Sequence, residues 1–198
     1  MSLVPGRPVV LRGPRVELST PAEPDIDRVA ELCRDPAIAE WTTVPSPYER
    51  SDAESFICEM VADGWASGRG CTWAIREDGQ VLGLIGLDGI ADHAAEIGFW
   101  LAPEARGRGL MTEATGLVLD FAFAEAPDGV GLQRVEWHAF GGNIASAAVA
   151  RRAGFRFEGV SRLGAVQRGI RRDDWQAGLL RDDPRAAADG WPAETFGA

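Results

Sequence analysis

The chain contains no lysine, because all 20 of its basic residues are arginine. A phosphate-binding loop of the Walker type ends in Gly-Lys followed by Ser or Thr, so a loop of that type is excluded. Cysteine is also scarce. Cys33, Cys58 and Cys71 cannot pair completely, and their spacing does not suit a metal. We therefore expect neither a disulfide framework nor a metal site.

Long apolar runs are missing as well. No run of about 18 or more apolar residues occurs, which excludes a transmembrane span. The segment 1–7 lacks the apolar region of a signal peptide. We therefore expect a cytoplasmic protein with no membrane partner.

Positive charge is in deficit, since 30 acidic residues stand against 20 basic ones and the formal net charge is −10. Binding to nucleic acid relies on clustered positive charge, so no nucleic-acid partner is expected. The acidic balance suits a cationic partner instead.

The length of 198 residues and the hydrophobic content of 45% suit one compact core. We expect a single domain over residues 1–184 and a C-terminal tail over 185–198. The Pro, Asp and Gly content of that tail is typical of poorly ordered ends, although Trp191 and Phe196 could dock it on the domain.

Hydrophobic periodicity and capping signals predict alternating strands and helices. The expected strands are 9–19, 71–76, 81–90, 94–101, 133–140, 155–163 and 170–180. The expected helices are 20–33, a short one within 35–49, 51–65, 110–124 and 144–153. Thr20 to Glu23 and Ser51 to Glu54 have the spacing of capping boxes.

The most informative segment is 96–114, which is expected to form an apolar strand, an Arg/Gly loop and the start of a helix. Gly107 and Gly109 allow a sharp turn and a close approach of the backbone to a ligand. Unpaired N–H groups at the helix N-terminus would then form an anion site suited to a pyrophosphate. Arg106 and Arg108 add positive charge beside those groups.

A dinucleotide-binding fingerprint does not fit this loop, because Thr112 stands where its third glycine is required. What remains is the pattern Arg-x-x-Gly-x-small from Arg106, with Met111 where a small residue is usual. This pattern resembles the coenzyme A loop of the GNAT acyltransferase superfamily.

A second segment, 143–159, contains Asn143-x-x-Ser146 at the start of a predicted helix and Gly154-Phe155 after its end. It resembles the ribosomal-protein alanine N-acetyltransferases of the RimJ/RimL type. The strand at 96–101 resembles the central strand of the same group. The resemblance extends from about residue 15 to residue 180.

The resemblance implies an α+β (α/β-like) fold with a mixed central sheet of about six to seven strands. Two central strands, 94–101 and 133–140, would part to admit the pantetheine arm of acetyl-coenzyme A, with no metal required. The implied coenzyme A-binding residues are Phe99, Trp100, Leu101, Arg106, Gly107, Arg108, Gly109, Leu110, Met111, Thr112, Asn143 and Ser146. Arg151 or Arg152 could reach the 3′-phosphate of the adenosine, and the alternative interpretation is that both are simply solvated on the surface of the helix.

The implied chemistry is direct attack of an amine on a thioester. Glu96 is the candidate base, with a strand-edge salt bridge as its alternative interpretation. Asp35, Glu40, Glu49 and Asp52 are the other candidate bases. Ser146 is the candidate hydrogen-bond donor to the thiolate, because Ala150 occupies the helix position where many relatives have a tyrosine and Tyr48 is the only tyrosine. His93 and His138 are interpreted as structural.

We therefore expect an acyl-coenzyme A-dependent N-acetyltransferase that acts on a primary amine. An α-amino group is the easier acceptor. It costs about 1 kcal/mol to hold neutral at pH 7, against about 5 kcal/mol for a lysine amine. The alternative is a non-catalytic acyl-coenzyme A sensor or interaction module. By analogy with the family, the last strands and the tail are the place where two copies would pair.

Overall fold

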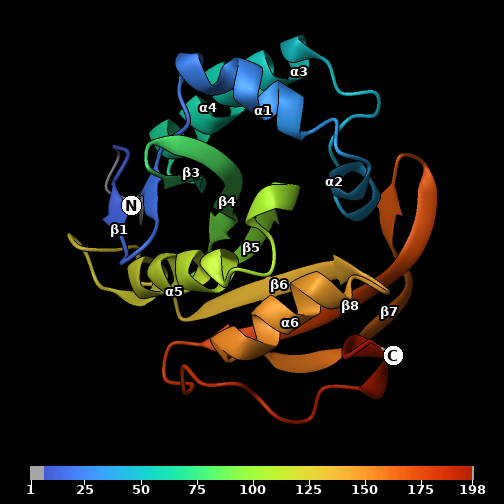
Figure 1. The fold of residues 1–198 in the computed structure, drawn as a ribbon. Helices are drawn as coiled ribbons and strands as arrows, with labels where there is room; N and C mark the ends of the chain where they lie inside the picture. The colour runs from blue at the N-terminus through green and yellow to red at the C-terminus, as the bar shows by residue number, and fades with distance from the viewer. Residues whose placement is uncertain (1–6, 198) are drawn as a thin grey trace.

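The computed structural model describes residues 7–197, and a single mixed sheet runs through this part of the chain. Residues 1–6, for which no signal peptide is expected, and residue 198 of the tail lie outside it. The sheet has eight strands in the order β1-β2-β3-β4-β5-β6-β8-β7 (Figure 1). They are β1 Leu11–Arg12, β2 Glu17–Ser19, β3 Gly70–Glu77, β4 Gln80–Ala91, β5 Ala94–Leu101, β6 Arg134–Phe140, β7 Arg156–Gln167 and β8 Ile170–Leu180. Neighbouring strands are antiparallel except for the parallel pair β5 and β6.

Helices lie on the sheet in two groups. These are α1 Ile26–Leu32, α2 Pro36–Trp41, α3 Arg50–Ser55, α4 Ala62–Ser67, α5 Leu110–Phe123 and α6 Ile144–Ala153, with a π-helical stretch, η2 Phe56–Val61, between α3 and α4. Helices α1 and α3 pack together near β4, whereas α5 and α6 pack together beside the point where β5 and β6 separate (Figure 1).

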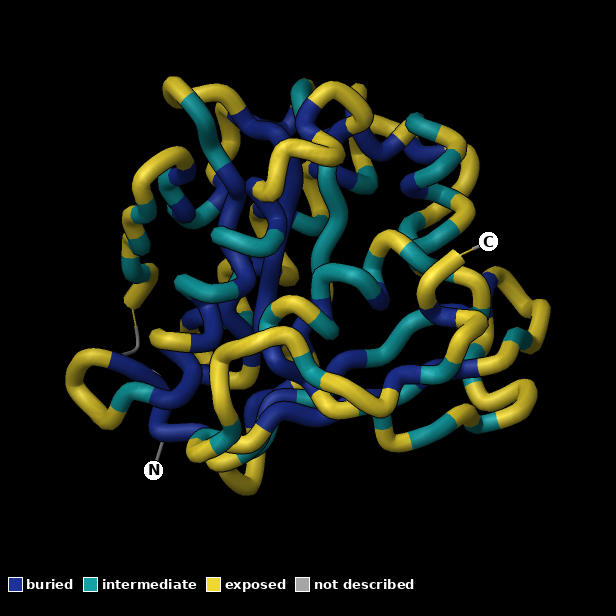
Figure 2. Tube along the Cα trace, turned by 60° about the horizontal axis from the view of Figure 1, so that its bottom comes forward, coloured by how far each residue is buried: buried dark blue, intermediate teal, exposed yellow. Residues whose placement is uncertain are grey.

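Alternate residues of the central strands fill two apolar clusters on opposite faces of the sheet. On β3, Trp73 and Ile75 belong to the larger cluster with α5, whereas Ala74 belongs to the smaller cluster with α1 and α3. This alternation follows from the two-residue period of a strand. Figure 2 shows the buried chain concentrated along the central strands. The central strands are therefore held by packing on both faces of the sheet.

The expected fold class is confirmed, but the sheet has eight strands rather than six to seven. The difference arises at 9–19, which forms two strands because the chain turns back at Gly13-Pro14. The Gly13 N–H donates to the Val16 carbonyl in this turn (2.9 Å). The expected strands 94–101 and 170–180 and the expected helix 144–153 have the observed bounds.

The two capping boxes lie elsewhere than expected. The Asp25 carboxylate accepts from the Ala22 N–H, and the Asp52 carboxylate accepts from the Glu49 N–H, both at 2.8 Å. Asp25 also binds Arg76 across 2.6 Å, which fixes it at the start of the helical segment. At the first of these boxes, a contact with the distant strand β3 therefore helps to select Asp25 rather than Glu23.

The C-terminal segment packs on the sheet. Trp191 is only 6% exposed, and its indole N–H donates to the Phe155 carbonyl over 3.0 Å. Its ring lies 5.5 Å from that of Trp137, measured between centroids. The division into a domain at 1–184 and a tail at 185–198 remains a prediction.

Two features are absent from residues 7–197. No helix in this range is long and apolar enough to cross a membrane. No group of three or more His, Cys, Asp or Glu side chains in the same range is arranged to hold a metal ion.

Candidate active site

The parallel strands β5 and β6 separate halfway along their length. Within the described residues, their register covers Ala94, Ala95 and Glu96, and it ends where Glu96 lies opposite Glu136. Strand β5 nevertheless stays paired with β4 as far as Leu101, and β6 stays paired with β8 as far as Phe140. Each strand beyond Glu96 therefore turns one edge of peptide groups toward the gap. An extended ligand could pair with such an edge as an added strand does.

A cavity of about 990 Å³ lies where the gap meets α5 and α6. Its lining includes most of the coenzyme A-binding residues expected from the sequence, namely Phe99, Trp100, Leu101, Arg106, Gly107, Gly109, Leu110, Met111, Thr112, Asn143 and Ser146. Residues far apart in the sequence are thus brought to one surface.

The loop before α5 has the conformation that its glycines predict. Gly107 and Gly109 have φ angles of 72° and 79°, in the left-handed region that favours glycine. Helix α5 begins at Leu110, and no side chain in the described part of the chain caps it. Its first N–H groups therefore remain available to an anion.

The two arginines of the loop are engaged with carboxylates. Arg106 lines the cavity, where it donates to the Leu101 carbonyl (3.0 Å) and to Asp35 (2.9 Å). Arg108 extends to Glu77, whose carboxylate oxygens lie 2.6 and 2.8 Å from one of its nitrogens. The Arg108 side chain is therefore turned away from the surface that its neighbours line.

Another arginine holds this loop from the turn between β1 and β2. The Arg15 guanidinium donates to the Arg108 carbonyl over 2.8 Å and to Glu113 over 2.7 Å. Both Arg15 and Glu113 line the large cavity. The sequence carried no local signal for this contact, because Arg15 and Glu113 are 98 residues apart.

The two adjacent arginines of α6 lie in different surroundings. Arg152 lines the large cavity. The Arg151 guanidinium stacks instead on the Phe196 ring, 3.9 Å from its centroid. Arg152 is therefore the one placed to meet an anionic ligand.

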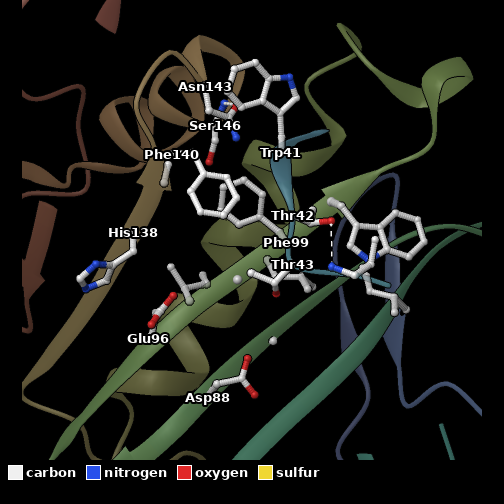
Figure 3. A pocket seen from close by; sticks show the side chains of 18 of the residues that line it. Trp41, Thr42, Thr43, Asp88, Glu96, Phe99, His138, Phe140, Asn143 and Ser146 are labelled. Atoms are coloured by element: carbon white, nitrogen blue, oxygen red, sulfur yellow. Dashed lines mark hydrogen bonds between the residues drawn. The ribbon is translucent and has the colours of Figure 1, made fainter. Parts of the chain in front are cut away.

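A second cavity, of about 470 Å³, lies where β4, β5, β6 and β8 meet the segment after α2. Its wall includes Asp88, Glu96, His138 and Asp174. The two cavities share wall residues Trp41, Thr42, Phe99, Trp100, Asn143 and Ser146. Figure 3 shows Phe99 and Ser146 at this junction, with Glu96 and His138 deeper in the smaller cavity.

Glu96 faces a second carboxylate across the sheet. Asp88 is its direct partner on β4, and both side chains open into the smaller cavity. Glu96 is exposed to the open cavity, but the cavity walls displace part of the water around its carboxylate, which raises its pKa; the charge of His138 lowers this pKa, and the charge of Asp88 raises it again. The net direction is upward. Asp88 is also exposed to the cavity, and the same partial loss of water raises its pKa. A raised pKa suits a carboxylate that must exchange protons near neutral pH.

Ser146 and Asn143 stand at the start of α6. The Asn143 side chain accepts from the Ser146 N–H over 3.2 Å and so caps the helix. The Ser146 hydroxyl oxygen accepts from the Trp137 indole N–H over 2.9 Å. The hydroxyl proton of Ser146 therefore remains available to a ligand.

The other four candidate bases do not line the smaller cavity. Asp35 caps α2 and binds Arg106, and Asp52 caps α3. The side chains of Glu40 and Glu49 also lie outside its wall. By contrast, His138 lines this cavity, as do the acidic residues Asp88 and Asp174, which the sequence did not single out. All three are polar residues within strands, and this was the sequence feature that could have marked them as candidate site residues.

A mixed sheet whose central parallel strands part beside a glycine loop at a helix N-terminus defines an acyl-coenzyme A-dependent acyltransferase. The chain belongs to the GNAT acetyltransferase family, since the family model "Acetyltransferase (GNAT) domain" matches residues 15–156. It is an N-acetyltransferase that takes its acyl group from acetyl-coenzyme A. The resemblance to this family is thereby confirmed, and the assignment as an enzyme replaces the alternative of a sensor.

Relatives and solved structures agree with the family. The chain is 31% identical over 164 residues to "Putative ribosomal N-acetyltransferase YdaF" of Bacillus subtilis (strain 168), which covers 79% of this chain and 86% of that protein. A GNAT-family structure from Chromobacterium violaceum has a TM-score of 0.74 at 28% identity, covering 87% of this chain and 86% of the other. Mycobacterium smegmatis RimJ with CoA-disulfide has the same fold, with a TM-score of 0.78 at 24% identity, covering 91% and 90%.

Proposed function

We propose that this enzyme transfers an acetyl group to the α-amino group of a peptide or of a small amine, in the cytoplasm of a bacterium. The observation that carries the proposal is the junction of the two cavities at Phe99 and Ser146. One cavity has the features of a coenzyme A site, and the other is lined by carboxylates. The thioester and the amine would meet where they join.

The large cavity suits coenzyme A on three counts. The free edge of β5 after Glu96 offers peptide groups to the pantetheine arm, so Phe99, Trp100 and Leu101 would bind it. The amides from Gly107 to Thr112 would bind the pyrophosphate at the uncapped start of α5. Arg152 lies in the same wall and would meet a further phosphate.

The smaller cavity suits a cationic amine. Asp88, Glu96 and Asp174 place negative charge around the route by which an ammonium group would enter. An α-ammonium group is held neutral for about 1 kcal/mol at pH 7, whereas a lysine ammonium costs about 5 kcal/mol. The acceptor is therefore an α-amine in this proposal.

Glu96 and Ser146 would divide the proton chemistry. Glu96 takes a proton from the amine, directly or through water, as its nitrogen attacks the carbonyl carbon. A backbone N–H near Phe99 or Trp100 holds the oxygen on which negative charge develops. Ser146 donates its hydroxyl hydrogen bond to the departing thiolate, because its oxygen is already bound by Trp137.

Two measurements test this proposal. Acetyl-coenzyme A should raise the melting temperature more than equal concentrations of NAD or ATP, because a ligand that binds the folded state stabilises it. Coenzyme A release should then be followed with a peptide bearing a free α-amine, and with the same peptide blocked at its N-terminus but containing lysine. Mass spectra that show acetylation only at lysine side chains would defeat the α-amine assignment.

A further inference from the structure

His138 lies in the wall of the smaller cavity rather than in the core. It stands on β6 near Glu96, and its side chain is 33% exposed. Its Nδ1 lies 2.9 Å from Oδ2 of Asp174 on the neighbouring strand β8. Figure 3 shows the imidazole on the same side of the sheet as Glu96. A histidine that only filled the core would not open into the cavity.

Asp174 is held in place by further contacts. Its side chain is 12% exposed, and its Oδ2 also accepts from the Gln176 amide over 2.8 Å. The same amide donates to the Ser161 hydroxyl on β7 over 3.0 Å. A carboxylate fixed in this way accepts the Nδ1 proton of the imidazole, which leaves the lone pair on Nε2. Three strands thus cooperate to set one tautomer of His138.

Acidic groups from several strands lie around the imidazole. Asp174 on β8 contacts it directly, Glu96 on β5 and Glu158 on β7 interact with its charge, and Asp88 on β4 and Glu136 on β6 act on Glu96 in turn. Arg134 pairs with both Glu136 and Glu158, which offsets part of their charge. The facing wall is formed by Trp41, Thr42, Thr43, Ala165 and Val166, which are uncharged.

The chemistry of the proposed function requires two proton acceptors. An α-ammonium group must lose one proton before its nitrogen can attack, and the nitrogen must lose a second as the amide forms. One carboxylate can take only one of them. The departing thiolate recovers one proton, and the other must reach solvent.

We propose that His138 takes the first of these protons on Nε2 and releases it to solvent, with Asp174 as its positioning residue. This inference rests on the proposed function. The now neutral nitrogen then forms the C–N bond, its second proton passes to Glu96, and the C–S bond breaks. The second proton then passes from Glu96, by way of water and the Ser146 hydroxyl, to the thiolate. Glu96 and Ser146 are thereby restored, and one proton is released for each amide made.

The first test reads the tautomer and does not depend on turnover. The chain has 2 histidines, so the ¹⁵N-coupled NMR signals of His138 are identified by comparison with the variant His93→Gln. Above the pH at which the imidazole is neutral, the proton should reside on Nδ1 in the wild type. In Asp174→Asn this preference should be lost. A wild-type imidazole with its proton on Nε2 would overturn the proposal.

The second test is the pH dependence of acetyl transfer to an α-amine peptide. His138→Ala should lower kcat roughly 100-fold, with an unchanged KM for acetyl-coenzyme A. Added imidazole should restore part of the rate. Asp174→Asn should lower kcat less and shift the pH profile, whereas His93→Gln should behave as the wild type. Thermal stabilisation by acetyl-coenzyme A reports whether each variant is folded, and His138→Gln replaces any alanine variant that is not.

The outcomes separate the two proposals. If folded His138→Ala or His138→Gln keeps the wild-type kcat and pH profile, the role of His138 is wrong and the proposed function stands. A reduced rate with an unaltered profile and no recovery in imidazole would also overturn it, because a structural residue behaves in this way. A wild-type protein that acetylates no amine would overturn both.

Discussion

The indole nitrogen of Trp137 donates a hydrogen bond to the hydroxyl oxygen of Ser146 over 2.9 Å, across the contact between β6 and α6. Trp137 is buried, so its N–H depends on this partner. Ser146 in turn lines both cavities. One hydrogen bond therefore links the packing of α6 on the sheet to the place where the thioester and the amine would meet.

Ser146→Ala should change stability and turnover together. The buried indole N–H would lose its partner, which costs about 1–3 kcal/mol of unfolding free energy. A hydrogen bond to a charged thiolate contributes about 1.5–3 kcal/mol, so kcat should fall roughly 10- to 100-fold. Urea unfolding and coenzyme A release measure the two effects. Ser146→Thr keeps a hydroxyl and is the control. An alanine variant with the wild-type kcat would remove the hydroxyl from the chemistry.

The cross-strand pair of Asp88 and Glu96 predicts a pH shift. The partial loss of water raises the pKa of Glu96, and the charge of Asp88 adds to this rise. Glu96 must be deprotonated to act as a base, so kcat should increase with pH above the ordinary carboxyl range. Asp88→Asn removes one raising charge, and the increase should then occur at lower pH. Profiles measured from about pH 5 to about pH 9 test this. An unchanged midpoint would show that the two carboxylates do not interact.

The same substitution has a second readout in stability. A group whose pKa rises on folding stabilises the folded state when it is protonated. Its contribution to the free energy of unfolding is present below the pKa of the unfolded state and is lost as the pH rises through the pKa of the folded state. Asp88 is itself such a group. Asp88→Asn should therefore be more stable than the wild type at neutral pH, and the difference should vanish near about pH 4. Asp92→Asn, in the exposed turn between β4 and β5, is the control.

The parts of the site that lie close together in the sequence could be predicted from it. Gly107 and Gly109 belong to one loop, and the Asn143 cap lies three residues before Ser146. Local spacing decides the geometry of such groups, so the motifs alone predicted the turn at Gly107 and Gly109 and the start of α6.

Contacts between distant segments could not be predicted in this way. His138 and Asp174 are 36 residues apart in the sequence. They become neighbours only because β8 pairs with the whole length of β6. Arg108 was expected to face the phosphates, but Glu77 on β3 holds its side chain. No residue near Arg108 in the sequence indicates that a carboxylate from another strand will bind its side chain. Charge pairing across the sheet therefore redirects side chains that a motif places only approximately.

The adjacent arginines of α6 provide a matched pair for the coenzyme A site. Arg152 lines the large cavity, whereas Arg151 stacks on Phe196. Arg152→Ala should weaken acetyl-coenzyme A binding roughly 10-fold, which corresponds to one charge-assisted hydrogen bond of about 1.5 kcal/mol. Arg151→Ala should leave the affinity unchanged. Calorimetric titration measures both. Equal losses in the two variants would indicate a general effect of positive charge.

Gln167 connects the hairpin of β7 and β8 to the last turn of α2 and to Thr42, the residue that follows it. Its side-chain amide donates to the carbonyl oxygens of Ala39, Glu40 and Thr42, at 3.2, 2.8 and 2.7 Å. Gln167→Glu has nearly the same shape but turns a carboxylate toward these oxygens. It should cost about 1–3 kcal/mol of stability and raise the KM of the acceptor more than that of acetyl-coenzyme A. Arg171→Gln, whose wild-type side chain donates to Leu163 within the hairpin, is the control. Equal KM values in Gln167→Glu and wild type would separate the hairpin from acceptor binding.

A larger side chain at Gly98 should close the smaller cavity without disturbing the loop before α5. Gly98 lies opposite Gly86 on β4, and both line the smaller cavity. A Cβ atom on Gly98 would have Asp88 Oδ2 as its nearest contact, at 3.9 Å, so the backbone has room for a side chain. Gly98→Leu should therefore fold and still be stabilised by acetyl-coenzyme A. Its branched side chain would occupy the space next to Glu96, and turnover with a peptide amine should be lost.

The size series at Gly98 distinguishes steric closure from damage to the strand. Gly98→Ala adds one methyl group at ordinary contact distance and should retain most of the activity. Gly98→Val and Gly98→Leu should lower kcat/KM for the peptide in order of size, with acetyl-coenzyme A binding constant throughout. Calorimetry and coenzyme A release measure the two quantities on the same samples. If Gly98→Leu acetylates the peptide as fast as wild type, the amine does not pass through this cavity. If acetyl-coenzyme A binding falls in step with turnover, the side chain acts through the cofactor site instead.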